Sequence, residues 1–499
     1  MKKKILLWLN ADLIDFCMSY YLQKITDAEF YAIIDITNKP KKFFNKQKLV
    51  QFKKIWFYHD HIKTDKPLDL DHLTDIEKRF NLNLWKLSLN ERIFYLFNEF
   101  HKFTRHEILS ILDCECTFFD KILHEVKPDF FITNKTALHH EHLFYIMCKS
   151  NGVKTFMLSQ PNLGYRYMIS SSENPGVFDS LKTLEDTQST NRTLEDLTKY
   201  LDGASLETQI KNYRSEYRKS KNDKLNAFKN FIINKNLNIK SHYTYSGRTK
   251  YRVLKSELVA SFRRKKRKNF IDHHLKSELP STPFVYFALG VDEERHILLS
   301  APFYTNQIET IRNIVKAMPI KFQLVVKENP NQDMRDWRKI SEYKEILEIP
   351  NVTLLHPSFP TKKIYQACSI VITTGGTTGF EGAFYGKPSI ILSDLGYQIL
   401  PSVYRLDSAE NLSQTIKKAL ETKFDVTALD KYINFIEKNT FVFHLKDLEN
   451  KYHNAFYFGG NLVDVDISID TMKKFLEENK SDLMLLANEY MKKINLGIK

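Results

Sequence analysis

Short apolar runs alternate with longer amphipathic stretches over the first 170 residues of the chain. The runs predict strands at Ile5–Leu9, Phe30–Ile34, Ile55–Phe57, Phe130–Thr133 and Thr155–Leu158. Helices are predicted between or beside them, among them Glu107–Val126 and His142–Ser150. Strands that alternate with helices in this way favour a parallel sheet with crossover helices.

The same alternation returns in cleaner form from residue 283. Five strands are predicted there, within PFVYFAL, FQLVVKENP, NVTLLHP, SIVIT and PSIILS. Helices are predicted between them, including Phe303–Met318, Arg335–Leu347 and Thr361–Cys368. This order of strands and crossovers predicts a second doubly wound domain.

The remaining segments are polar and helix-compatible, without a strand period. The sequence therefore predicts an α/β fold in four parts. These are a Rossmann-like domain over 1–170, a basic helical insertion and linker over 171–280, a second Rossmann-like domain over 281–420 and a helical C-terminal segment over 421–499.

Composition argues against a disordered, a membrane-spanning and a disulfide-rich protein. The 42% hydrophobic content indicates globular domains, and no apolar run approaches the roughly eighteen residues that a membrane span needs. The start, MKKKILLWLN, is read as a first strand because its apolar run is too short for a signal peptide. The five cysteines suggest neither a disulfide framework nor a zinc site, so a reducing, cytoplasmic compartment is expected.

The positive charge is concentrated in one segment. The chain carries a net charge of +14, but residues 211–280 alone hold 20 Lys and Arg against 5 Asp and Glu. The rest of the chain is therefore nearly neutral, and the basicity describes the insertion and not the whole molecule.

Glycine is also concentrated. Of the 15 glycines in the chain, 5 lie between Gly375 and Gly386, after the predicted strand SIVIT. Thr378 and Glu381 have the spacing of a capping box, while Gly386 and Pro388 would end the helix. Glycine inside a helix costs about 0.5–1 kcal/mol relative to alanine, so Gly376, Gly379 and Gly382 indicate close approach of a backbone or a ligand. A helix start at the carboxyl end of a parallel sheet suits phosphate.

This stretch resembles the donor-binding stretch of GT-B glycosyltransferases. There, a Ser/Thr-Gly loop is followed by a Glu one turn on, then by Gly-Lys-Pro and a strand, as in TTGGTTGFEGAFYGKPSIIL. It is most similar to the capsule and surface-polysaccharide biosynthesis branch, which includes transferases that use CMP-activated keto sugars. The resemblance runs from about Phe284 to Leu392 and includes VKENP and NVTLLHP.

The resemblance implies which residues hold the donor. The donor phosphate would bind Thr374, Gly375, Gly376, Thr377 and Thr378, and the ribose would bind Glu381. The strand ends add Lys327, Asn329 and His356 as donor-binding candidates. The branch usually has Lys-Glu-His-Pro where this chain has Asn329 before Pro330. Asparagine can donate a hydrogen bond to phosphate but cannot carry the charge of a histidinium.

Candidates in the first domain follow its last strands. His139, His140 and Glu141 are expected near the carboxyl edge of the first sheet, where a base could take the proton of an acceptor hydroxyl. Solvated residues at a helix start are the alternative, as is a metal site, but His139 and His142 lack a third ligand, so no metal is expected. Arg166 could contact a phosphate or an acidic sugar, or lie exposed beside a turn.

The basic run consists of Arg263, Arg264, Lys265, Lys266, Arg267 and Lys268. An anionic membrane surface and a nucleic acid would both attract it, and a solvated helix face is the third possibility. Two doubly wound domains favour the membrane, so nucleic acid is not expected as a partner.

The sequence thus predicts a metal-independent GT-B glycosyltransferase without a cofactor, because the nucleotide sugar is a substrate. Its first domain would bind a surface-polysaccharide or lipid-linked glycan acceptor, and its second domain the nucleotide-sugar donor. It would be cytoplasmic, with peripheral association at the inner face of the membrane. The alternatives are a non-hydrolysing nucleotide-sugar 2-epimerase and a non-catalytic nucleic-acid-binding protein.

Overall fold

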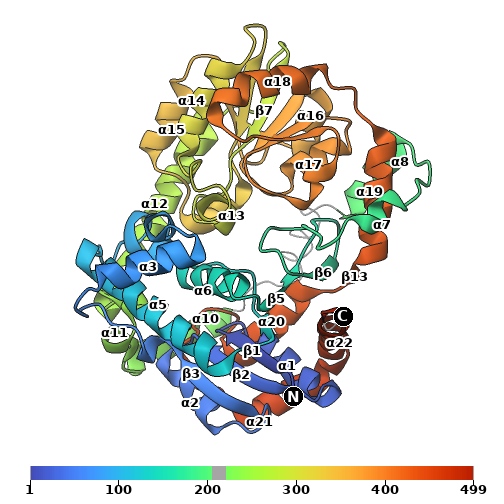
Figure 1. Ribbon diagram of the computed structural model, residues 1–499. Helices are drawn as coiled ribbons and strands as arrows, with labels where there is room; N and C mark the ends of the chain where they lie inside the picture. Colours follow the sequence, from blue (N-terminus) through green and yellow to red (C-terminus); the bar gives the residue numbers. More distant parts are fainter. Residues whose placement is uncertain (1, 205–220, 498–499) are drawn as a thin grey trace.

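The computed structural model describes residues 2–204 and 221–497, which form two α/β domains and the helices that join them (Figure 1). Each domain is built on a mainly parallel sheet with helices on both faces. Central strands such as β10, Ile370–Thr373, are buried along their whole length. Burial on both faces explains why these strands read as continuous apolar runs in the sequence.

The first sheet has the strand order β13-β6-β5-β4-β1-β2-β3. The five predicted strands are present and parallel, as β1 (Lys4–Leu9), β2 (Glu29–Ile34), β3 (Phe52–Phe57), β4 (Phe130–Ile132) and β5 (Lys154–Ser159). Two antiparallel strands extend the edge, β6 (Arg166–Ser170) and β13 (Phe441–Val442). The helices of this domain are α1 (Ile14–Ile25), α2 (Asn38–Lys46), α3 (Leu70–Phe80), α4 (Leu84–Leu89), α5 (Arg105–Val126) and α6 (His139–Ser150).

The second sheet is wholly parallel, in the order β12-β11-β10-β7-β8-β9. Its strands are β7 (Phe284–Ala288), β8 (Gln323–Lys327), β9 (Val352–Leu355), β10, β11 (Ser389–Ile391) and β12 (Val403–Arg405). Its helices are α13 (Arg295–Leu298), α14 (Gln307–Ala317), α15 (Ile340–Leu347), α16 (Thr361–Ala367), α17 (Thr378–Ala383) and α18 (Leu412–Glu421). This is the doubly wound order of a Rossmann fold, and it reverses between β7 and β10. The two domains confirm the predicted GT-B-like fold class.

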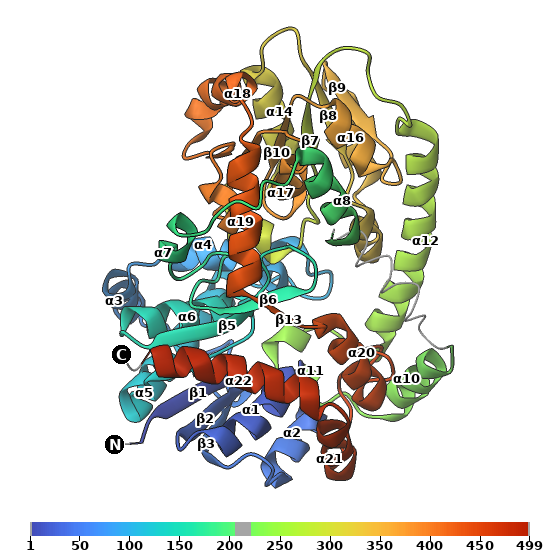
Figure 2. The ribbon, with the colours of Figure 1, turned by 90° about the vertical axis from the view of Figure 1, so that its right-hand side faces the viewer.

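The basic insertion consists of helices joined by loops in the part that the structure describes. Its helices are α7 (Lys182–Glu185), α8 (Leu194–Ala204), α10 (Lys221–Ile233), α11 (Asn238–Ser241) and α12 (Lys250–His274). Figure 2 shows α12 running beside both domains. No helix in the described part of the chain is both long enough and apolar enough to cross a membrane.

The C-terminal segment is helical, as predicted; residues 426–439 share a core with the second domain, and residues 445–496 pack on the first domain. Its helices are α19 (Val426–Asn439), α20 (Leu445–Phe456), α21 (Ile469–Glu478) and α22 (Lys480–Leu496). Helix α22 lies along α1 and β6 (Figure 2). Leu483, Leu486 and Tyr490 of α22 share one buried core with Phe16 of α1. The end of the chain therefore completes the hydrophobic core of the first domain.

Replacing Leu483 by Ala should lower the free energy of unfolding by about 2–5 kcal/mol, because its fully buried side chain would leave a cavity between α22 and the first domain. The matched control is Leu485→Ala on the same helix, where the side chain is exposed and the change should stay within about 0.5 kcal/mol. Denaturant unfolding measures both, and equal losses would contradict this packing of α22.

Candidate functional site

The carboxyl ends of the two sheets face each other. Arg295 opens α13 shortly after β7, and its buried guanidinium crosses to the first domain. There it donates to the carbonyl oxygen of Thr136, which follows β4, and pairs with Glu173 at 2.9 Å. Gly396, after β11, donates its N–H to the carbonyl oxygen of Pro175 at 3.0 Å. Ligands of doubly wound sheets bind outside the carboxyl ends of the strands, so this junction is the candidate site.

The glycine-rich loop lies in the second domain at the reversal of strand order, directly after β10. Side-chain hydroxyl groups hold three successive carbonyl oxygens of this loop. The pairs are Ser393 with Thr374 at 2.8 Å, Thr373 with Gly375 at 3.1 Å, and Tyr397 with Gly376 at 2.8 Å. The N–H groups of Gly375, Gly376 and Thr377 have no acceptor among the residues that the structure describes. The loop is therefore held in place through its carbonyl groups while its N–H groups remain available.

Different physical constraints explain why glycine occupies each of these positions. Gly376 has a φ of +110°, and a Cβ added there would meet no atom within 4 Å. At Gly379 a Cβ would come within 2.9 Å of the Tyr397 hydroxyl, and at Gly382 within 2.9 Å of a methyl group of Val371. Close packing of α17 on the protein interior thus explains Gly379 and Gly382. Of the three glycines for which the sequence suggests close approach, only Gly376 borders open space.

The predicted capping box is wrong. Helix α17 begins at Thr378 with Thr377 as its N-cap, and no side chain caps it. Glu381 instead accepts a hydrogen bond from the Tyr365 hydroxyl at 2.9 Å. The spacing of Thr378 and Glu381 fits a box only if Thr378 precedes the helix, whereas here it is already the first helical residue.

Two basic residues at the junction were not among the selected site residues. The ring of His296 borders the loop, since a Cβ at Gly375 would lie 3.2 Å from its Cδ2, and its Nδ1 pairs with Glu294 at 3.0 Å. Lys135 follows β4, and its side chain reaches solvent. The protein packed around it and the charge of nearby Arg295 lower the pKa of Lys135 to about 8. It is therefore still a cation at neutral pH. Position after a strand is the sequence signal for both residues.

Two of the predicted donor residues are held by neighbours in the second domain. Lys327 at the end of β8 is buried, and its Nζ donates to the Thr361 hydroxyl at 2.6 Å. Asn329 caps the following turn, where its side-chain oxygen accepts the N–H of Asn331 at 3.0 Å. Both contacts hold the backbone that follows β8 in place.

Two other selected residues lie outside the junction. His356 follows the edge strand β9, three strands from β10 and so about 14 Å away, and its Nε2 pairs with Asp272 of α12 at 3.1 Å. Arg166 begins β6, and its guanidinium donates to the carbonyl oxygen of Glu437 at 3.1 Å and the hydroxyl of Thr440 at 3.4 Å. The structure does not bring either residue to the glycine-rich loop.

His139, His140 and Glu141 begin α6 in the interior of the first domain. His139 and His140 are 0% and 1% exposed, and both nitrogens of each ring lie within hydrogen-bonding distance of another side chain. Glu141 accepts the backbone N–H groups of Ala137 and Leu138, which orders the start of the helix. An acceptor hydroxyl could reach either imidazole only after these buried contacts opened.

Residues 190–429 match the model of a protein family described as capsule polysaccharide biosynthesis protein. The matched segment includes the whole second sheet and the glycine-rich loop. No curated protein matches the chain. The family match confirms the resemblance that the loop and its flanking strands predicted.

The solved structures to which this chain is similar include an epimerase and a transferase. UDP-GlcNAc 2-epimerase from Methanocaldococcus jannaschii, in complex with UDP-GlcNAc and UDP, is 12% identical, with 88% of this chain and 99% of that chain covered and a TM-score of 0.25. KpsC, a beta Kdo 2,7 transferase from Thermosulfurimonas dismutans, is 10% identical, with 77% and 90% covered and a TM-score of 0.30. TM-scores this low do not allow the activity of either enzyme to be assigned to this chain. Its own two doubly wound sheets and the match over 190–429 identify the chain as a GT-B-like protein that resembles the capsule polysaccharide biosynthesis proteins.

Proposed function

We propose that this protein is a metal-independent GT-B glycosyltransferase that moves a sugar from a nucleotide-sugar donor to a surface polysaccharide or a lipid-linked glycan. The observation that carries the proposal is the set of available N–H groups at Gly375, Gly376 and Thr377, on a loop fixed at the domain junction. Successive backbone N–H groups of this kind bind phosphate oxygens. Held in place before the reaction, they would also stabilise the charge of the departing nucleotide phosphate.

The remaining groups at the junction have complementary roles in this proposal. Lys135 of the first domain would add positive charge near the phosphates, and the ring of His296 borders the loop from the second domain. Glu381, oriented by the Tyr365 hydroxyl, would accept hydrogen bonds from the ribose. The acceptor would enter from the first domain, whose loop after β4 lies opposite. CMP-activated keto sugars are among the donors proposed, because transferases of the resembled branch use them.

Replacing Gly376 by Val should weaken binding of the nucleotide sugar more than tenfold. Valine is strained at a φ of +110°, so the loop must shift and its N–H groups lose their positions. Gly152→Val is the matched control, because Gly152 also has a positive φ and open space around a Cβ but lies in the turn before β5. The free energy of unfolding should fall by similar amounts in both variants, and only Gly376→Val should lose affinity for the donor.

A thermal-shift screen of CMP-, UDP-, GDP- and dTDP-sugars identifies the donor, and calorimetry then compares the two variants. Wild-type protein that binds none of these donors, or equal affinity in wild type and Gly376→Val, would contradict the proposal. Conversion of the nucleotide sugar without any acceptor would indicate an epimerase instead.

Replacing Glu381 by Gln should weaken donor binding by roughly 1–3 kcal/mol, the usual contribution of a hydrogen bond to a charged group. Tyr365→Phe is the control, since it removes the hydroxyl that orients Glu381 while leaving the carboxylate in place. It should have a smaller effect on donor affinity. A silent Glu381→Gln variant in calorimetric titration would exclude the ribose contact.

We also propose that α12 contacts an anionic membrane surface. Arginines and lysines of the basic run lie in different surroundings. Arg263 pairs with Glu99 of the first domain at 2.7 Å, and Arg264 pairs with Asp336 of the second domain at 2.7 Å. Lys265 and Lys266 are exposed and pair with no acid among the described residues. The arginines therefore connect α12 to the two domains, and the lysines carry charge that is available to a surface.

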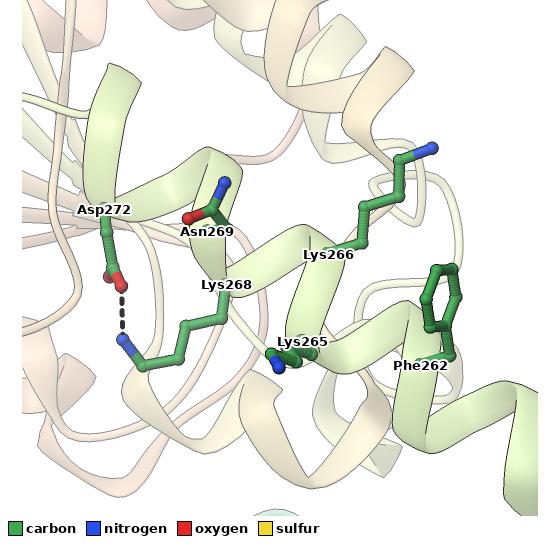
Figure 3. A pocket seen from close by; sticks show the side chains of 6 residues that line it. All are labelled: Phe262, Lys265, Lys266, Lys268, Asn269 and Asp272. Atoms are coloured by element: carbon green, nitrogen blue, oxygen red, sulfur yellow. Dashed lines mark hydrogen bonds and ion pairs between the residues drawn. The ribbon is translucent and has the colours of Figure 1, made fainter.

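Exposed apolar side chains accompany these lysines. Phe262 is 71% exposed and Leu258 is 74% exposed on the same helix. Figure 3 shows Phe262, Lys265 and Lys266 along a pocket of 470 Å³, with Lys268 paired to Asp272. Basic residues beside exposed apolar residues on one helix suit the headgroup region of an anionic bilayer.

Replacing Lys265, Lys266 and Lys268 together by Ser should reduce sedimentation with vesicles that contain anionic lipid at least tenfold, since each lysine near such a surface contributes about 1 kcal/mol. Salt should release the wild-type protein. The control is Lys473→Ser with Lys474→Ser, which removes two exposed lysines of α21. Vesicle binding that is absent in wild type or unchanged in the triple variant rejects the membrane contact. Duplex DNA binding that the triple variant loses would favour the nucleic-acid alternative.

A further inference from the structure

Three buried side chains of the first domain converge on one point. Glu115 of α5 and His139 and His140 of α6 place ligand atoms within 4.8 Å of one another. Their side chains are 0–1% exposed, and the Nε2 of His139 lies 3.0 Å from Oε1 of Glu115. The sequence offers no third ligand beside His139 and His142, so no metal was expected from it. In the fold, His142 lies outside the cluster, and His139 is joined instead by His140 and by Glu115 of α5.

The outer ring nitrogens of both histidines face carboxylates. Nδ1 of His139 lies 3.0 Å from Oε2 of Glu91, and Nε2 of His140 lies 3.0 Å from Oδ2 of Asp35. A histidine that binds a metal characteristically donates its other ring N–H to a carboxylate or a carbonyl group. The two carboxylates therefore fix both tautomers so that His139 Nε2 and His140 Nδ1 remain for the interior of the cluster.

The interior of the cluster has unused acceptor capacity. Oε1 of Glu115 accepts a hydrogen bond from the Tyr58 hydroxyl, whereas its Oε2 is buried and has no partner among the described residues, which is costly for a charged group. The Tyr243 hydroxyl lies 3.3 Å from Nδ1 of His140 and 3.0 Å from the hydroxyl of Tyr58. A cation held here would therefore find a fourth oxygen close to the three main ligands.

We propose that Glu115, His139 Nε2 and His140 Nδ1 bind one Zn²⁺ ion, with the Tyr243 hydroxyl beside it as the fourth oxygen. Two imidazoles and a carboxylate are a ligand set that zinc accepts. Tetrahedral zinc with bonds of about 2.0–2.2 Å separates its ligand atoms by about 3.3 Å, close to the 3.0 Å between His139 and Glu115. Binding would release the proton that lies between His139 Nε2 and Glu115.

The ion would be structural, because the three main ligands are shielded from solvent. It would connect α5 to α6 and, through Tyr243, would anchor the basic insertion on the first domain. Glu115, His139 and His140 lie outside residues 190–429, the segment that matches the family, and only Tyr243 lies inside it. It takes no part in the proposed sugar transfer, and neither proposal depends on the other.

The test measures zinc binding by the full-length protein after treatment with a chelator. Competition with a chromophoric chelator should show one Zn²⁺ per chain, and zinc should raise the unfolding temperature. Glu115→Gln and His139→Asn should each weaken binding more than 100-fold. Glu91→Gln, which alters only an outer partner, should weaken it about 10–100-fold. His142→Asn is the matched control on α6, since His142 pairs with Glu173 outside the cluster, and it should retain the zinc.

Co²⁺ in place of Zn²⁺ gives a readout on the unmodified protein if the ligand variants fail to fold. Visible absorption bands should appear at one equivalent, and X-ray absorption at the zinc edge should show two imidazole nitrogens at about 2.0–2.1 Å. Wild-type protein that takes up neither Zn²⁺ nor Co²⁺ overturns the proposal, and the cluster is then a hydrogen-bonded network alone. Full zinc affinity in folded Glu115→Gln and His139→Asn would overturn it equally.

Discussion

The buried guanidinium of Arg295 constrains how the two domains meet. A buried charge is tolerated only when it is paired and hydrogen-bonded. Besides Ser300 of its own domain, Arg295 has Thr136 and Glu173 across the junction as partners, and rotation of the second domain away from the first would break those contacts. Because Arg295 follows β7 and Thr136 follows β4, the contact brings the carboxyl edges of both sheets together. The glycine-rich loop, His296 and Lys135 lie at this junction as a consequence.

Local pattern predicted the sheets well and their edges poorly. Parallel strands covered by helices on both faces need continuous apolar runs, so β1 to β5 and β7 to β11 could be read from the sequence. The strands β6, β12 and β13 were missed. Strands β12 and β13 have only three and two residues, and β6 and β13 are antiparallel additions at the edge of the first sheet, β13 from the far end of the chain. The capping box failed for a similar reason. Its spacing was correct, but the start of α17 and the contact of Glu381 with Tyr365 are decided by tertiary packing.

Strand ends located the candidate site more reliably than residue type did. The loop over Thr374–Thr378 was identified because its glycines gather directly after a predicted strand, and the structure places that strand end at the reversal of strand order. His139 and His140 were chosen for their chemistry, yet their environment depends on Glu91, Glu115 and Asp35, which are distant in sequence. No spacing rule connects α5 to the start of α6. The three-dimensional arrangement buries both histidines among these carboxylates, which the sequence did not predict, and their catalytic role stays a prediction.

The central claim is that available backbone N–H groups of the glycine-rich loop bind the donor phosphates at the domain junction. Hydrogen–deuterium exchange of residues 374–380, with and without the nucleotide sugar, measures those N–H groups directly. The account predicts slower exchange in this loop on donor binding, together with slower exchange after β7 near His296. Donor binding that leaves the exchange of this loop unchanged and protects another part of the chain would contradict it.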